Sequence, residues 1–119
     1  GEGDVVIFNT GWQALADSDP IRFMASSPGL GMAGAKYLAA KGVVAIGADN
    51  WGLEAVPAED ETQAFPVHQE LLAKQGIYIL ENIRTDQLAA DKAYEFMFVL
   101  GQPRFVGAVQ VVINPVAIR

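Results

Sequence analysis

The segment VHQELLAKQGIYILEN, residues 67–82, constrains this chain most, because it holds the only histidine of the protein. His68 opens a short amphipathic helix that Gly76 ends, and the apolar residues 77–80 that follow are typical of a buried strand. Glu81 closes that strand. If the strand runs back beneath the helix, the imidazole and the carboxylate converge, and such a pair can bind a metal or move protons.

Composition limits the classes of function. The chain has 119 residues, enough for one domain with a buried core, so we expect a single domain over residues 1–119. The net charge of −6 argues against nucleic acid and anionic membranes as partners, and no apolar run reaches the roughly 20 residues of a membrane helix. The absence of cysteine excludes disulfides and thiolate zinc sites and fits a cytoplasmic location. Because 51% of the residues are hydrophobic, we expect an apolar face that another chain covers.

The hydrophobic pattern predicts an α/β domain with a mixed sheet and flanking helices. Apolar runs between turn residues predict strands over residues 5–8, 43–46, 77–80, 95–100 and 106–113, with 116–118 at the end of the sheet. Helical spacing and caps predict helices over 31–41 and 68–74, and shorter ones over 21–24 and from residue 85 or 86. The first strand, helix and second strand form a βαβ unit with a parallel strand pair. Residues 50–64, rich in carboxylates, are expected to form an exposed loop.

Five residues are candidates for the lining of a substrate pocket. Asp49 follows the second predicted strand, and sites of parallel α/β sheets form at the carboxyl ends of strands, although a turn cap explains an Asp-Asn pair equally well. Loop residues such as Trp51 and Glu54 can line a pocket, but a loop tryptophan more often anchors an interface. The complete set of candidates is Trp12, Asp49, Trp51, Glu54 and Phe65.

His68 and Glu81 each have an ordinary structural alternative. A lone histidine beside an apolar helix face is usually structural or simply exposed. A carboxylate at the end of a strand often caps a helix or pairs with an arginine, and Arg84 is nearby in the sequence. A catalytic metal normally has three protein ligands, so two residues would form an incomplete site.

The chain resembles the second half of the bacterial cyclase family. The resemblance rests on GDVVIFNTGW, PGLGMAGAKYLAAKGVVAIGAD, VHQELLAKQGIYILENI and FVLGQPRFVGAVQVVINPVAIR, which occur in the order typical of the family and cover nearly the whole chain. The family includes kynurenine formamidase and isatin hydrolase, metal-dependent hydrolases that open amide or lactam bonds. The resemblance implies a swivelling β/β/α-type fold that is incomplete without a partner half or an oligomer.

The resemblance also implies the metal chemistry. It places metal ligands at His68 and Glu81 and implies a divalent ion, Mn²⁺ or Zn²⁺, bound only when the other half is supplied. The family motif H-x-G-T-H-x-D-x-P-x-H, which carries the other ligands and the acid/base histidine, belongs to the first half of the family and is absent from this chain with its one histidine. The partners expected are therefore an N-terminal half on another chain or a homo-oligomer, and a small-molecule substrate.

Two functions remain open. The chain is either the C-terminal portion of a metal-dependent amidohydrolase acting on an N-formyl, amide or lactam bond, or a non-catalytic homo-oligomeric module that retains the scaffold. The first function predicts an enzyme that is inactive as this chain alone and active once the other half is supplied. The second predicts an apolar binding pocket near Trp12, Trp51 and Phe65 that does not depend on His68.

Overall fold

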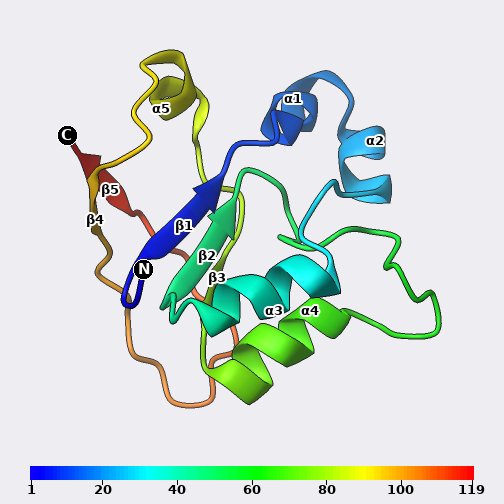
Figure 1. Ribbon diagram of the computed structural model, residues 1–119. Coiled ribbons are helices and arrows are strands. Elements are labelled where there is room, and N and C mark those ends of the chain that lie inside the picture. Colours follow the sequence, from blue (N-terminus) through cyan, green and yellow to red (C-terminus); the bar gives the residue numbers. More distant parts are fainter. The chain divides into compact units, whose positions relative to one another are not determined.

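A three-stranded parallel sheet organises the computed structural model, which describes all residues from 1 to 119. Strands β1 (Val5–Phe8), β2 (Ala45–Ala48) and β3 (Tyr78–Leu80) lie in the order β1-β2-β3 (Figure 1). All four residues of β2 are buried, because the central strand has a neighbour on each edge and both of its faces are covered. The predicted βαβ unit is confirmed, although the second strand covers 45–48 rather than 43–46.

Two helices lie side by side and form the core with this sheet (Figure 1). They are α3 (Met32–Ala40) and a second helix that begins as α4 (Pro66–His68) and continues with π-helical geometry as η2 (Gln69–Gln75). Ala35 of α3 and Leu71 of η2 are fully buried in one cluster of core side chains. Both predicted helices are confirmed. None of the helices in the chain has the length and apolar composition needed to cross a membrane.

The segment between β1 and α3 contains short helices. They are η1 (Trp12–Ala14), α1 (Leu15–Ser18) and α2 (Pro20–Ala25). The side chain of Asp19 caps α2 by accepting a hydrogen bond from the backbone N–H of Arg22 at 3.1 Å. The short helix expected over residues 21–24 is thus confirmed.

The prediction that residues 50–64 form an exposed loop is wrong for the first part of that segment. Leu53 and Glu54 are buried, each with 1–2% of its surface exposed. Residues 53–56 run beside residues 27–30, with isolated β-bridges that join Leu30 to Glu54 and Ser27 to Val56. This pairing satisfies the backbone polar groups of both segments and allows them to be buried.

The chain divides into two compact units, Gly1–Gln87 and Leu88–Arg119, with α5 (Asp86–Ala90) at the division. The parallel sheet and the two long helices belong to the first unit. The second unit contains a two-stranded antiparallel sheet of β4 (Met97–Val99) and β5 (Val116–Ile118). The predicted α/β class with a mixed set of strands is confirmed, whereas the single domain over 1–119 stays a prediction.

The prediction of a strand over residues 106–113 is wrong. Those residues form no strand, and Val106, Val109 and Val112 are almost completely exposed. The strand over 95–100 is confirmed only at its centre, where β4 pairs with residues 116–118. A run of apolar residues satisfies a strand pattern, but a strand also needs a partner for its backbone groups, and residues 116–118 occupy that position beside β4.

Candidate functional site

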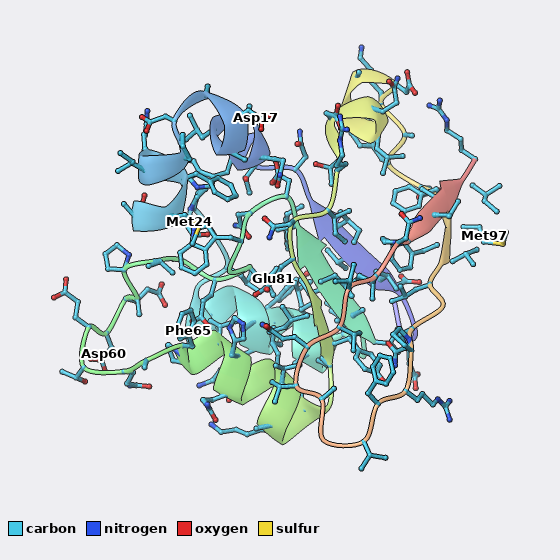
Figure 2. All side chains as sticks on the ribbon, turned by 180° about the vertical axis from the view of Figure 1, so that it is seen from behind. Asp17, Met24, Asp60, Phe65, Glu81 and Met97 are labelled. Atoms are coloured by element: carbon cyan, nitrogen blue, oxygen red, sulfur yellow. The ribbon has the colours of Figure 1, made fainter.

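His68 and Glu81 converge in the first unit. His68 is the last residue of α4, while Glu81 comes directly after the carboxyl end of β3. The Nε2 atom of His68 lies 3.3 Å from Oε1 of Glu81, and about a fifth of each side chain is exposed. Figure 2, in which Glu81 is labelled, shows this residue near the end of the sheet, where the helix begins. The predicted convergence is confirmed, because β3 runs parallel to β2 after the helix has reversed the direction of the chain.

Glu54 also contacts His68, a contact that the sequence did not predict. Its carboxylate accepts hydrogen bonds from the backbone N–H of Val67 at 3.0 Å and of His68 at 3.2 Å, and Nδ1 of His68 contacts the same oxygen as the His68 amide. The first N–H groups of a helix have no partner inside the helix, and Pro66 contributes none. Glu54 is therefore a helix cap supplied by a distant segment, and it orients the imidazole as well.

The two carboxylates raise the pKa of His68 above its usual value. The hydrogen bond to Glu81 is the largest cause, and the hydrogen bond and charge of Glu54 act in the same direction. Partial burial of the ring lowers the pKa and opposes them without reversing the shift. His68 therefore holds its proton to a higher pH in the folded protein than in the unfolded chain.

This shift predicts that the protein becomes less stable as the pH rises from about 6.5, the ordinary pKa of histidine, through the higher pKa of folded His68. Below that range both states are protonated and the full contribution to the free energy of unfolding is present. Above that range, His68 is neutral in both the folded and the unfolded state, and the contribution is lost. Urea unfolding at a series of pH values checks the prediction. In His68→Gln, the free energy of unfolding should change less with pH over this range than in the wild type. An unchanged dependence on pH would contradict the assignment to His68.

Asp49 connects the ends of β1 and β2. Its carboxylate accepts hydrogen bonds from the backbone N–H and the hydroxyl of Thr10, at 2.7 and 2.6 Å, and from the backbone N–H of Gly11 at 2.8 Å. The side chain is 2% exposed. These three bonds fix the turn after β1, so Asp49 caps a turn, although at Thr10–Gly11 rather than in the Asp-Asn turn that the sequence suggested. Its place in a substrate pocket stays a prediction.

The other pocket candidates fall into two contact groups. The indole N–H groups of Trp12 and Trp51 both donate to the backbone carbonyl of Phe23, at 3.2 and 2.8 Å. Phe65 instead packs with its ring edge against His68, with 5.2 Å between the ring centroids and 73° between the planes, and is labelled at the start of α4 in Figure 2. Phe65 therefore lies at the His68 site, while the tryptophans fix the end of α2.

A cavity of about 190 Å³ lies at the carboxyl ends of β1 and β2. Sequence reasoning did not identify its lining, which includes no charged side chain and none of the five predicted pocket residues. The position itself was predictable, since ligands of parallel sheets bind where adjacent strands end. The lining residues are Phe8, Asn9, Thr10, Gly29, Leu30, Ala48, Asn50 and Leu53.

The donor atoms of His68 and Glu81 suit two positions around one metal ion. Two ligands that each lie about 2.0–2.2 Å from a zinc-sized ion are roughly 3–3.5 Å apart, and the observed N–O separation is 3.3 Å. Nε2 contacts Glu81 while Nδ1 contacts Glu54. The chain offers no group of three or more His, Cys, Asp or Glu side chains arranged to hold a metal ion.

Comparisons with known proteins agree with this fold. Residues 1–55 match the family model named Cyclase. A solved structure, described as the crystal structure of a novel cyclase, matches the chain with a TM-score of 0.84 and 31% sequence identity. The match covers 99% of this chain and 41% of that one, so the chain spans less than half the length of that cyclase. No curated protein matches the chain. The match of residues 1–55 to the family model and the structural match over nearly the whole chain both show similarity to cyclases.

Proposed function

We propose that the chain contributes His68 and Glu81 to the site of a metal-dependent amidohydrolase that cleaves an N-formyl, amide or lactam bond. The observation that carries the proposal is the 3.3 Å approach of His68 Nε2 to Glu81 Oε1, after a parallel strand of a cyclase-like fold. The substrate class follows from the resemblance of the sequence to kynurenine formamidase and isatin hydrolase. The proposed location is the cytoplasm, in keeping with a chain without cysteine.

The residues of this chain have distinct roles in the proposed site. The Nε2 atom of His68 and the carboxylate of Glu81 would hold a divalent ion, Mn²⁺ or Zn²⁺. When bound, such an ion polarises the scissile carbonyl and makes water more acidic. Phe65 packs with its ring edge against the imidazole. The remaining ligands and the histidine that exchanges protons with the substrate are assigned to polypeptide outside these 119 residues.

A fusion tests the proposal. The chain would be joined to the part of the matched cyclase that it does not cover, loaded with Mn²⁺ or Zn²⁺, and assayed on an N-formyl aromatic amine and on a lactam. We expect hydrolysis of one of the two classes and a loss of kcat/KM of at least about 100-fold in His68→Ala, because removing a metal ligand costs more than removing an outer partner of the site.

Gln69→Ala is the matched control, because Gln69 is the exposed neighbour of His68 on the same helix. It should retain activity. A folded, metal-loaded fusion that hydrolyses neither class would rule out the amidohydrolase function and leave the non-catalytic scaffold as the better account. Equal losses in His68→Ala and Gln69→Ala would show that the helix, rather than the imidazole, is what the activity needs.

A further inference from the structure

We infer that Glu54 is a positioning residue: by accepting the Nδ1–H of His68, it holds the ring with Nε2 on the side of Glu81 and makes Nε2 the nitrogen that loses its proton when the ring becomes neutral. The consequence for metal binding rests on the proposed function, but the arrangement itself can be observed in the chain alone. Glu54 is 2% exposed, whereas His68 and Glu81 are 21% and 23% exposed. The two carboxylates at this histidine therefore differ in environment, one being buried and the other accessible.

The backbone contacts of Glu54 fix its carboxylate in space. One oxygen accepts the amide of Val67, and the other accepts both the amide of His68 and the Nδ1 contact. Rotation of the carboxylate would leave N–H groups at the start of the helix without acceptors in a buried place, which carries a free-energy penalty. The imidazole therefore meets an acceptor whose position the helix itself determines.

The backbone of Glu54 is held in turn by the segment before α3. Its bridge to Leu30 and the hydrogen bond from Leu30 N–H to the carbonyl of Leu53, at 2.9 Å, keep residues 53–54 next to residues 29–30. Histidines that bind metals commonly donate their second ring N–H to a carboxylate, which sets the tautomer and the orientation of the ring. Glu54 provides this arrangement on the Nδ1 side, and Nε2 is left, beside Glu81, as the nitrogen that an ion would bind.

The simpler alternative is that Glu54 only caps a helix, and the chain contains the control for it. Glu59 accepts a hydrogen bond from the backbone N–H of Met32 at 2.9 Å, and so caps α3 from a distant loop. Glu59 is not among the groups that hydrogen-bond to the imidazole of His68 or shift its pKa. A pure capping role predicts similar results for Glu54→Gln and Glu59→Gln, while a positioning role predicts that only Glu54→Gln changes the imidazole.

The tautomer of His68 is the direct measurement. Two-bond ¹H–¹⁵N correlation spectra of the ¹⁵N-labelled chain distinguish Nδ1–H from Nε2–H, and the only histidine of the protein gives the only imidazole signals. Spectra would be recorded at a pH where titration of each protein shows a neutral ring. We expect Nδ1–H in the wild type and in Glu59→Gln, and a shift to Nε2–H in Glu54→Gln.

An Nε2–H tautomer in the wild type would overturn the inference without any variant, so the test does not depend on whether Glu54→Gln folds. An Nδ1–H tautomer that persists in folded Glu54→Gln would also overturn it. In the metal-loaded fusion, Glu54→Gln should weaken affinity for Zn²⁺ by about 10–100-fold, measured by chelator competition, and Glu59→Gln should not.

The outcomes separate this inference from the proposed function. If the tautomers are as expected and the fusion binds metal but hydrolyses nothing, the amidohydrolase function fails and the positioning role stands. If the fusion hydrolyses a substrate while Glu54→Gln keeps the wild-type tautomer and Zn²⁺ affinity, the positioning role fails and the function stands.

Discussion

Leu71→Ala is expected to lower the free energy of unfolding of the first unit by about 2–5 kcal/mol. Leu71 is fully buried, in a cluster that includes Ala35 of α3 and Ile46 of β2. Truncation removes the apolar atoms and leaves a cavity that the packed neighbours fill only in part. Urea unfolding followed by circular dichroism measures the loss. Because His68 lies on the same helix, weaker anchoring of Leu71 should also make the His68–Glu81 contact less well defined.

The neighbouring residue provides the control for this prediction. Leu72 has the same side chain on the same helix, but it is 44% exposed. Leu72→Ala should therefore cost less than about 1 kcal/mol, a value typical of surface substitutions with a small change in helix propensity. Similar losses in the two variants would contradict the assignment of Leu71 to the core and of this helix face to the sheet.

Local pattern predicted the parallel part of the fold well. The alternation of short apolar runs with a helix that ends at a glycine is sufficient for β1, α3 and β2, because each run has a helix to cover it and a neighbouring strand to pair with. The same logic brought His68 and Glu81 together from opposite ends of a helix–strand pair. Their meeting depends on the reversal of the chain between them, a condition of the prediction that the structure fulfils.

The position of Glu54 could not be read from the sequence, because it depends on a tertiary pairing. The carboxylates around residues 54–61 look alike in a sequence and suggest a solvated loop. Only the pairing of residues 53–56 with 27–30 buries Glu54 and turns it toward the first N–H groups of α4. A proline at the start of a helix without a local cap, as at Pro66, was the available signal that the cap comes from elsewhere.

In the second unit, the sequence pattern predicted a strand that the structure does not form. Residues 106–113 are rich in apolar, β-branched residues like a strand, but the sequence pattern does not reveal which apolar segment obtains a partner. The antiparallel pair formed by β4 and β5 uses residues 116–118 instead. Four large apolar side chains of this segment, those of Phe105, Val106, Val109 and Val112, remain exposed in this chain. Strand propensity therefore located an apolar segment correctly and assigned its secondary structure wrongly.

Gly29→Ala is expected to lower the free energy of unfolding by about 3 kcal/mol, at the upper end of the cost of overpacking. A Cβ atom at Gly29 would lie 2.3 Å from the carbonyl oxygen of Leu53 and 2.4 Å from the carbonyl carbon of Glu54. These are backbone atoms, so the two paired segments must separate. Urea unfolding measures the loss, and the same separation should move the Glu54 carboxylate away from the imidazole.

Gly34→Ala is the matched control, and its effect should have the opposite sign. Gly34 lies inside α3, where alanine is favoured over glycine by roughly 0.5–1 kcal/mol, and the closest atom to its Cβ is the terminal Cδ1 of Leu30, which can rotate away. If Gly29→Ala were as stable as Gly34→Ala, the two segments would not be packed as described. If Gly29→Ala lost stability but kept the wild-type tautomer of His68, the carboxylate of Glu54 would be held by the helix N–H groups alone, and the segment before α3 would have no part in positioning the histidine.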